Sequence, residues 1–263
     1  MMIIMEKSVA VIGSGPAGLM CAEQLNANGF KVTVFDELKE FGGMIAYGIP
    51  EFRIPLKNIR ERILALKNKK IGFQNKKITS IKKLLRAFGG EFDFAVIAIG
   101  AGTGMKAGFK GEQEKQVIDA LEFLLNDKLN NNKMISKGEE VAVIGGGNSA
   151  MDAARVAIKQ GAKATIIYRR TENEMPALKN EIEGAKTDGV GFEFLKAPIE
   201  FRANSEKIIQ EKKPKGVLFC AEMILGEQDE SGRRKPIDSG KKTEYFFDKA
   251  ELSISVLLNL NDT

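Results

Sequence analysis

The chain has 263 residues, of which 43% are hydrophobic and 29% are charged, and its formal net charge is +5. This length and composition predict one large or two modest folded domains and exclude fibrous and intrinsically disordered classes. There is no histidine, and the two cysteines are Cys21 and Cys220, which excludes serine–histidine–aspartate catalysis, histidine-ligated zinc and an iron–sulfur cluster held by this chain.

The basic residues are scattered along the chain. The lysine-rich segment 67–70 has no interleaved aromatic residue, so we interpret it as solvated surface and expect no nucleic-acid binding. No run of 18 apolar residues predicts a membrane span, and Glu6 and Lys7 come too early for a signal peptide. Two distant cysteines suit a reducing compartment. We therefore expect a cytoplasmic protein that binds neither nucleic acid nor membrane.

The first half of the chain alternates between strand and helix patterns. A short apolar run ends at a glycine-rich loop and is followed by a helical pattern and a second apolar strand, which is the β–turn–α–β arrangement of a nucleotide-binding unit. The predicted elements are a strand over 9–12, a loop over 13–18, a helix over 19–28, a strand over 31–35, a helix over 56–69 and a strand over 95–99 that runs into Gly100.

The same pattern then starts again. The predicted elements are a helix over 117–129, a strand over 141–144, a glycine turn over 145–147, a helix over 148–160 and a strand over 164–168. From Phe192 onward, short β-like runs alternate with charged turns, which predicts an antiparallel flap. The sequence therefore predicts an α/β fold with two Rossmann-like dinucleotide-binding domains.

Three positions of each glycine loop have different structural roles. The first glycine allows the tight turn, the second lets the backbone approach a pyrophosphate, and the third lets the helix pack on the strand. The helix N-terminus then offers N–H groups to the phosphates. The three positions hold Gly13, Gly15 and Gly18 in the first loop, and Gly145, Gly147 and Ala150 in the second.

The residue at the end of each second strand separates the two sites. Asp36 lies there in the first unit, where a carboxylate accepts hydrogen bonds from a ribose with a free 2′-hydroxyl. Arg169 and Arg170 occupy the same place in the second unit, and guanidinium groups can fork onto the 2′-phosphate of NADP(H). A surface arginine pair after a packing loop is the alternative. One chain with both sites is the arrangement of a flavoprotein reductase that holds FAD first and NADPH second. Hydride transfer between these cofactors needs no protein acid or base, so no catalytic side chain is predicted.

Several longer segments resemble the small (beta) subunit of NADPH-dependent glutamate synthase. These segments are 11–19, 41–55, 143–152, 168–171 and 174–177, and the match extends over residues 7–245. The family also includes the NADPH-handling part of dihydropyrimidine dehydrogenase and the large subunit of ferredoxin–NADP transhydrogenases. The resemblance implies a split FAD domain with an inserted NADPH domain: residues 1–115 for the first part of the FAD domain, 116–245 for the NADPH domain and 246–263 for the return to the FAD domain.

The loops and the resemblance together give a set of predicted cofactor-binding residues. The set is Gly13, Ser14, Gly15, Pro16, Ala17, Gly18, Asp36, Glu37, Gly43, Met44, Gly48, Ile49, Arg53, Gly100, Gly145, Gly147, Asn148, Ser149, Asp152, Arg169 and Arg170; no metal ligand is predicted. The resemblance further implies that electrons pass to the glutamate synthase large subunit or to another iron–sulfur acceptor.

The sequence departs from the family at several points. Ile99 replaces the threonine of the family's Ala-Thr-Gly turn, and neither the cysteine-rich N-terminal domain nor the late Gly-Asp motif of the flavin site is found. We therefore expect FAD to be held weakly. Three explanations stay open: a separate chain completes the flavin site, the sequence is cut short, or the gene product has decayed into a partial protein. A non-catalytic NADP-binding remnant or an assembly subunit stays an alternative. A thioredoxin-reductase-like disulfide reductase is excluded because neither cysteine belongs to a C-x-x-C pair, and Cys21 is predicted to be a buried packing thiol.

Overall fold

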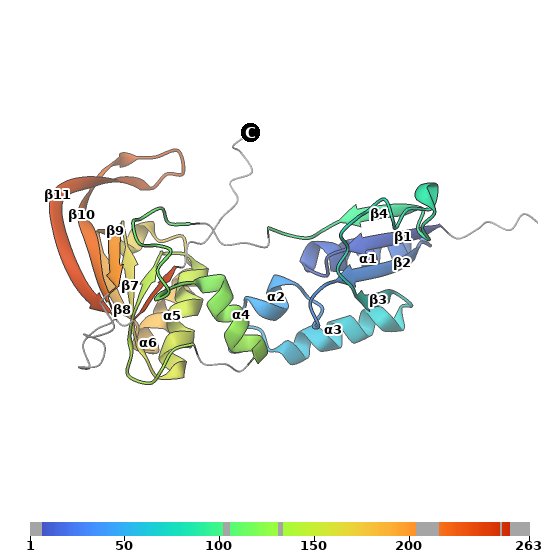
Figure 1. Cartoon of the computed structure of the whole chain (residues 1–263), viewed down its shortest axis with the longest axis horizontal. Helices are drawn as coiled ribbons and strands as arrows, with labels where there is room; N and C mark the ends of the chain where they lie inside the picture. Colours follow the sequence, from blue (N-terminus) through green and yellow to red (C-terminus); the bar gives the residue numbers. More distant parts are fainter. Residues whose placement is uncertain (1–6, 102–105, 131–133, 204–215, 248, 253–263) are drawn as a thin grey trace, which may run out of the picture. The chain divides into compact units, whose positions relative to one another are not determined.

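The computed structural model of the protein describes residues 7–101, 106–130, 134–203, 216–247 and 249–252 (Figure 1). The chain divides into two compact units, residues 1–102 and residues 103–263. Each unit contains a parallel sheet with its own helices and its own core. The predicted α/β class is confirmed.

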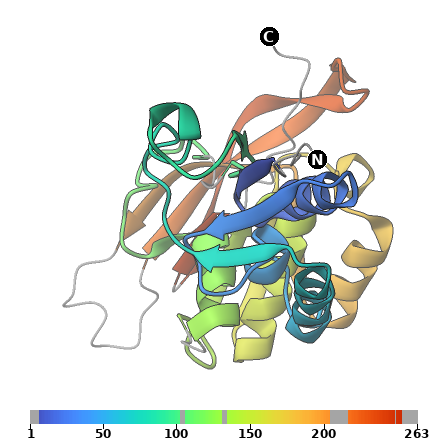
Figure 2. The same cartoon turned by 90° about the vertical axis from the view of Figure 1, so that its right-hand side faces the viewer.

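The first unit is built on a four-stranded parallel sheet in the order β3-β2-β1-β4. Its strands are β1 (Ser8–Ile12), β2 (Lys31–Asp36), β3 (Gly72–Asn75) and β4 (Phe94–Ile97), and its helices are α1 (Pro16–Ala27), α2 (Met44–Tyr47), α3 (Leu56–Asn68) and the short 3-10 helix η1 (Arg86–Phe88). The strands of this sheet are coloured from blue to green in Figures 1 and 2.

Both faces of this sheet contribute to packing. Val9 and Val11 of β1 face Ala22 of α1 and Leu66 of α3 in one cluster. The alternate residue Ile12 packs with residues of the 77–92 segment in a second cluster. Because successive side chains of a strand point to opposite faces, a strand covered on both sides reads as a continuous apolar run. This is why the sequence locates β1 so clearly.

The second unit contains a five-stranded parallel sheet in the order β5-β12-β6-β7-β8. Its strands are β5 (Val117–Asp119), β6 (Glu140–Ile144), β7 (Lys163–Tyr168), β8 (Gly191–Phe194) and β12 (Lys249–Leu252). The helical segments are α4 (Ala120–Asn130), α5 (Asn148–Gln160), η2 (Glu172–Glu174) and α6 (Lys179–Thr187).

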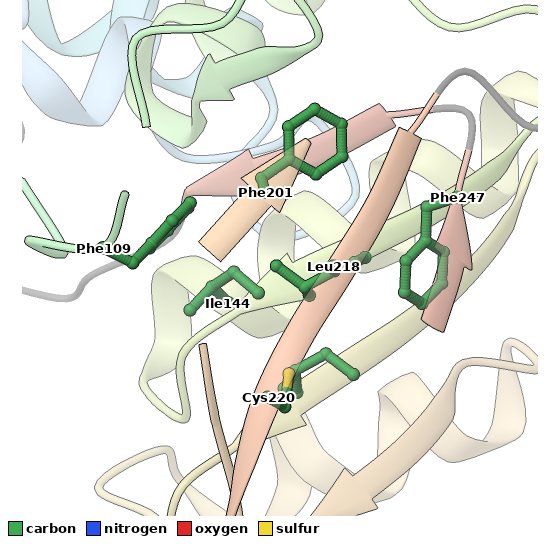
Figure 3. Close-up of a cluster of buried hydrophobic side chains, with 8 residues drawn as sticks. Phe109, Ile144, Phe201, Leu218, Cys220 and Phe247 are labelled. Atoms are coloured by element: carbon green, nitrogen blue, oxygen red, sulfur yellow. The ribbon is translucent and has the colours of Figure 1, made fainter. Parts of the chain in front are cut away.

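A three-stranded antiparallel sheet, in the order β11-β10-β9, packs on this parallel sheet. Its strands are β9 (Lys196–Ala203), β10 (Gly216–Gln228) and β11 (Arg234–Phe247). Figure 3 shows how β6, β9, β10 and β11 contribute side chains to the apolar layer between the sheets: Ile144, Phe201, Leu218, Cys220 and Phe247, together with Phe109 from a preceding loop. The antiparallel sheet therefore buries one face of the parallel sheet of the second unit.

The β10–β11 hairpin is longer than its neighbour β9. The pairing of β9 with β10 reaches Glu222, whereas the pairing of β10 with β11 continues to Gln228 and Arg234. The last part of the hairpin is therefore a two-stranded ribbon that ends in the turn 229–233, and it extends beyond the rest of the antiparallel sheet in both views (Figures 1 and 2).

Element boundaries differ from the predictions where a single residue decides the local geometry. Helix α1 begins at Pro16, three residues earlier than predicted, because proline at the first helical position loses no hydrogen bond. The predicted helix 117–129 is a strand followed by a helix. Asp119 marks the change, because its Oδ1 accepts hydrogen bonds from the N–H groups of Leu121 at 2.9 Å and Glu122 at 3.1 Å. The predicted flap begins at Lys196, since Phe192 lies in the parallel strand β8.

The last described strand lies in the sheet of the second unit. The strand order β8-β7-β6-β12 repeats the order β3-β2-β1-β4 of the first unit, so β12 is the fourth strand of the second unit. The described part of residues 246–263 lies in the second unit; residues 253–263 lie outside the described residues, and the predicted domain bounds stay a prediction. At the other boundary, Phe109 belongs to the core of the second unit, and Gly111 lies against the backbone of Phe201.

Candidate functional site: two nucleotide-binding loops

Packing within the first unit requires two glycines of the first loop. Gly13 has φ 105°, and a Cβ added to it would lie 2.1 Å from the carbonyl oxygen of Ala98. A Cβ on Gly18 would lie 2.0 Å from the carbonyl oxygen of Gly13. These distances are far below van der Waals contact, so strand β1, helix α1 and the end of β4 approach one another only because both side chains are absent.

Gly15, in contrast, faces open space. No described atom lies within 4 Å of a Cβ built on it, and it is the N-cap of α1, where no described side chain caps the helix. The first turn of α1 also has no acidic residue. The N–H groups at this helix end therefore point to a space that a pyrophosphate can fill. The absent Cβ and the uncapped helix fit the phosphates of a dinucleotide.

The Gly-Gly-Met segment lies directly against this loop. Gly43 has φ 55°, and a Cβ on it would lie 2.7 Å from the Cα of Gly15. Helix α2 follows, with Met44 exposed and Gly48 buried, and Ile49 and Arg53 are half-buried. Burial raises the pKa of the Tyr47 hydroxyl in α2 to about 12, although a hydrogen bond from the N–H of Glu40 opposes this effect.

Asp36 is held in place by the loop that it faces. Its Oδ2 accepts hydrogen bonds from the N–H of Ser14 at 2.8 Å and from the Ser14 hydroxyl at 2.6 Å, and its Oδ1 accepts one from the N–H of Leu38 at 3.0 Å. Ser14 is fully buried, and its hydroxyl also accepts a hydrogen bond from Gly42. A carboxylate has about four lone-pair sites, so one remains for a ribose hydroxyl.

The other predicted residues of the first unit lie at its surface. Pro16 and Ala17 are exposed at the start of α1, and Gly100 has φ 67° with no described atom near its Cβ position. Glu37 forms an exposed ion pair with Lys77, with 2.6 Å between Oε2 and Nζ. The structure therefore brings the loop 13–18, Asp36 and Gly43 together, whereas Glu37 is directed to a surface lysine.

The second loop has the same construction. Gly147 is the N-cap of α5, again without a described side-chain cap and without an acidic residue in the first turn. A Cβ on Gly146 would lie 2.5 Å from the ring of Tyr168. The Oδ1 of Asn148 accepts a hydrogen bond from the N–H of Leu178 at 3.0 Å, which links the start of α5 to the segment after η2. Ser149 is half-buried, whereas Asp152 is buried in the next turn of α5.

The structure separates the two arginines at the end of β7. The side chain of Arg169 is exposed and makes no hydrogen bond or ion pair with any part of the chain that the structure describes. Arg170 is only 5% exposed. Its Nη2 donates to Oδ2 of Asp229 at 2.6 Å, and its Nε donates to the carbonyl oxygen of Arg234 at 2.7 Å. Arg170 is thus engaged within the protein.

Three residues around the arginines were not predicted from the sequence. Glu174 accepts hydrogen bonds from the N–H and the hydroxyl of Thr171 in a capping box, and its other oxygen pairs with Nε of Arg234 at 2.6 Å. The Thr-x-x-Glu spacing is a local signal that indicates the first of these contacts. Asp229 and Arg234 belong to a hairpin about 60 positions farther along, and no local pattern indicates their proximity.

The two cysteines lie in different units and have different environments. Cys220 lies in the core layer of the second unit, and burial raises the pKa of its thiol to about 12. Cys21 was predicted to be a buried thiol, but it is only half-buried in α1 of the first unit. Both are free. Within the described ranges, no group of three His, Cys, Asp or Glu side chains is placed to hold a metal ion, and no helix has the length and apolarity needed to cross a membrane.

Comparison with known proteins agrees with this geometry. Residues 7–226 match the model of the pyridine nucleotide-disulphide oxidoreductase family. The chain is 38% identical, over 91% of its length, to the NADP(+)-dependent formate dehydrogenase subunit beta of Moorella thermoacetica. It is 36% identical, over 88% of its length, to the glutamate synthase [NADPH] small chain of Halomonas elongata. The resemblance drawn from the sequence motifs is confirmed.

A solved structure has a similar fold, and the relatives are longer than this chain. Thioredoxin reductase of Lactococcus lactis has a similar structure, with a TM-score of 0.67 and 18% identity over 95% of this chain and 77% of that one. The chain spans 33% of the formate dehydrogenase subunit and 49% of the glutamate synthase small chain. The match to the family model covers most of the chain, which therefore belongs to the pyridine nucleotide-disulphide oxidoreductase family.

Proposed function

We propose that this chain binds FAD in its first unit and NADPH in its second, as the hydride-transferring part of a flavin oxidoreductase of the glutamate synthase small-chain type. One observation carries the proposal. Two glycine loops, each at the start of a helix, are followed by opposite charges: Asp36 is the last residue of β2, and Arg169 directly follows β7. A carboxylate favours a free ribose hydroxyl, whereas a guanidinium favours a 2′-phosphate.

In the first unit, the N–H groups at the start of α1 would bind the pyrophosphate of FAD in the space beside Gly15. Asp36 would accept a hydrogen bond from the adenosine ribose with the lone-pair site that Ser14 and Leu38 leave open. Ser14 has no part in contacting the cofactor in this proposal, because it is fully buried and holds the carboxylate in position.

In the second unit, the start of α5 would bind the pyrophosphate of NADPH, and the exposed Arg169 would bind the 2′-phosphate. When bound, NADPH supplies a hydride that FAD accepts, so the transfer needs no acid or base from the protein. The protein contributes placement and charge, which is consistent with a chain that has no histidine.

We propose in addition that a partner subunit receives the electrons. The relatives include a small chain of glutamate synthase and a beta subunit of an NADP(+)-dependent formate dehydrogenase. Both names are those of one component of a larger enzyme. The glutamate synthase large subunit or another iron–sulfur protein is the class of partner that we propose for this chain.

The test is an absorbance measurement on the purified chain with added FAD, before and after anaerobic NADPH. We expect the flavin band to bleach with NADPH and much less with NADH at the same concentration. The substitution Arg169→Ala should weaken NADPH binding by about 1.5–3 kcal/mol, or about tenfold to a hundredfold, because one charge-assisted interaction is lost. Binding of NADH should not change.

The matched control is Lys163→Ala, which removes an exposed cation from the other end of the same strand. It should leave both nucleotides unaffected. Equal losses for NADPH and NADH in Arg169→Ala would contradict the assignment of this residue to the 2′-phosphate. Binding of NADPH without bleaching of the flavin would favour a non-catalytic NADP-binding role instead.

A further inference from the structure

The turn of the β10–β11 hairpin is fixed to the loop that follows β7. Arg170 donates to both ends of the turn, since Asp229 directly follows β10 and Arg234 begins β11. Within the turn, the N–H of Asp229 donates to the carbonyl oxygen of Arg233 at 2.7 Å. The turn is thus closed on itself and held by one buried guanidinium.

A second ion pair runs in the opposite direction. Arg234 of the hairpin donates from its Nε to Oε1 of Glu174, 2.6 Å away, while the other oxygen of Glu174 is held by Thr171. The hydroxyl of Tyr168 at the end of β7 donates to the carbonyl oxygen of Glu174 at 2.8 Å. Arg170, which follows β7, pairs with Asp229 of the turn, and Arg234 at the start of β11 pairs with Glu174 of η2. Two such crossed pairs fix the position of the turn.

This arrangement leaves Arg170 without the freedom to bind a ligand. Its guanidinium is buried against a carboxylate, and breaking a buried ion pair leaves an uncompensated charge. Arg169 has no such partner in the described chain, and its side chain is exposed. The two adjacent arginines therefore have different environments, although the sequence does not distinguish them.

The turn 229–233 also contains Arg233. Asp229 links Arg170 to Arg233: its Oδ2 accepts a hydrogen bond from Arg170, and its Oδ1 accepts one from the backbone N–H of Arg233 at 3.2 Å. Nε of Arg233 donates to the hydroxyl of Ser231 at 2.8 Å, which orients the guanidinium at the turn.

The charges around Arg169 agree with this placement. The pKa of the Arg169 guanidinium is lowered, first by desolvation by the surrounding chain and then by the like charges of Arg170 and Arg233. The charge of Asp229 only partly opposes this effect. Cations gathered in this way favour an anionic ligand with several acceptor oxygens, such as a phosphate.

We propose that the NADPH 2′-phosphate is bound by Arg169 and Arg233, and that Arg170 is a positioning residue which, through Asp229, holds the hairpin turn so that Arg233 reaches the site. This inference rests on the proposed function, because it concerns the nucleotide specificity of the second unit. It assigns a specificity-determining residue to the hairpin, outside the β–turn–α–β segment that carries the nucleotide motif.

The test is the binding of NADP⁺, NAD⁺ and 2′,5′-ADP to the full chain, measured by titration calorimetry. Arg233→Ala should weaken NADP⁺ and 2′,5′-ADP by about tenfold or more, because a charge-assisted hydrogen bond is lost, and should leave NAD⁺ unchanged. The melting temperature of each variant shows whether it is folded. Arg233→Lys keeps the positive charge and should therefore retain part of the affinity for NADP⁺.

The variant Asp229→Asn distinguishes the two possible roles of Arg170, because each role predicts an opposite change in the affinity for NADP⁺. If Arg170 is a positioning residue, this variant loosens the turn and weakens NADP⁺, and the loss disappears in a chain that already has Arg233→Ala. If Arg170 itself binds the phosphate, the same variant frees Arg170 and removes a negative charge, so NADP⁺ binds more tightly. The control is Glu230→Gln, which removes one negative charge from the exposed neighbour on the same turn and should not weaken binding.

The outcomes also separate this inference from the proposed function. An unmutated chain that binds NAD⁺ as tightly as NADP⁺ would overturn both. A chain that prefers NADP⁺, and keeps that preference in Arg233→Ala and Asp229→Asn, would retain the proposed function and overturn the role of the hairpin.

Discussion

Identical residues have different roles in this protein because their surroundings differ. Arg169 and Arg170 are adjacent in the chain, yet one is exposed and the other is buried against Asp229. Gly15 and Gly18 are three positions apart on the same helix start, yet one faces open space and the other touches the backbone of Gly13. At the residue scale, the environment of a side chain decides whether it serves packing or binding.

The two glycines allow a direct test of this distinction. Gly18→Ala should destabilise the protein by about 1–3 kcal/mol, because its Cβ would overlap the carbonyl oxygen of Gly13 and the backbone has to move. Gly15→Ala should leave the stability nearly unchanged, since its Cβ would meet no described atom within 4 Å. It should instead weaken FAD binding, because the methyl group occupies the space proposed for the pyrophosphate.

Chemical denaturation measures the stabilities in this comparison, and titration with FAD measures the affinities. A Gly15→Ala variant that is as unstable as Gly18→Ala would show that the space beside Gly15 is not open. Unchanged FAD binding in a folded Gly15→Ala variant would contradict the placement of the pyrophosphate there.

At the scale of elements, charged groups fix the hairpin turn to the loop after β7. The hydrogen bond from the Ser231 hydroxyl is the largest cause that lowers the pKa of Asp229; backbone hydrogen bonds of the turn and the charge of Arg170 add to it and outweigh partial burial. Burial raises the pKa of Glu174, but hydrogen bonds from Thr171 and Arg234 outweigh this effect, so its pKa is also lowered. Both carboxylates therefore favour their ionised form in the folded protein.

This gives a pH dependence with a defined sign. A lowered pKa stabilises the folded protein above the ordinary value, which is 3.8 for Asp229, and this contribution is lost as the pH falls through the folded pKa. Asp229→Asn should therefore lower the melting temperature at neutral pH, and the difference from the unmutated chain should shrink as the pH falls from 3.8 through the lowered pKa of Asp229. A difference that stays constant over this fall in pH would show that Asp229 acts by some means other than its charge.

At the scale of the whole molecule, the last described strand completes a sheet that begins more than 100 residues earlier. Strand β12 pairs with β5 through Ala250 and Val117 and with β6 through Glu251 and Val143. It is therefore an interior strand, and β5 contacts the rest of the sheet through it. The antiparallel hairpin precedes β12 in the chain and packs on the same sheet.

Ending the chain at Phe247 should remove this link. We expect amide hydrogen exchange to become faster in β5 and along β6, because their backbone groups lose the hydrogen bonds that β12 provides. Exchange in β1 and β2 serves as the internal control, since these strands belong to the sheet of the other unit and should keep their protection. Unchanged exchange in β5 would show that β12 does not hold it in the sheet.

The sequence by itself determined the features that depend on neighbouring residues. Strand β1, helix α5 and both glycine loops were predicted because buried parallel strands and glycine turns have strong local patterns. The opposite charges at Asp36 and Arg169 were also read from spacing alone. Local patterns further indicated that the chain holds two units of one kind, which the equivalent strand orders confirm.

Tertiary structure alone decided the features that join distant segments. The place of β12 follows from pairing with strands more than 100 positions earlier, and a short strand has no signal for its partner. The burial of Arg170 depends on Asp229 and Arg234, about 60 positions away on the hairpin. Side-chain environment is set by what packs against a residue. The periodicity of a segment indicates which of its faces is buried, but it does not indicate which distant segment covers that face.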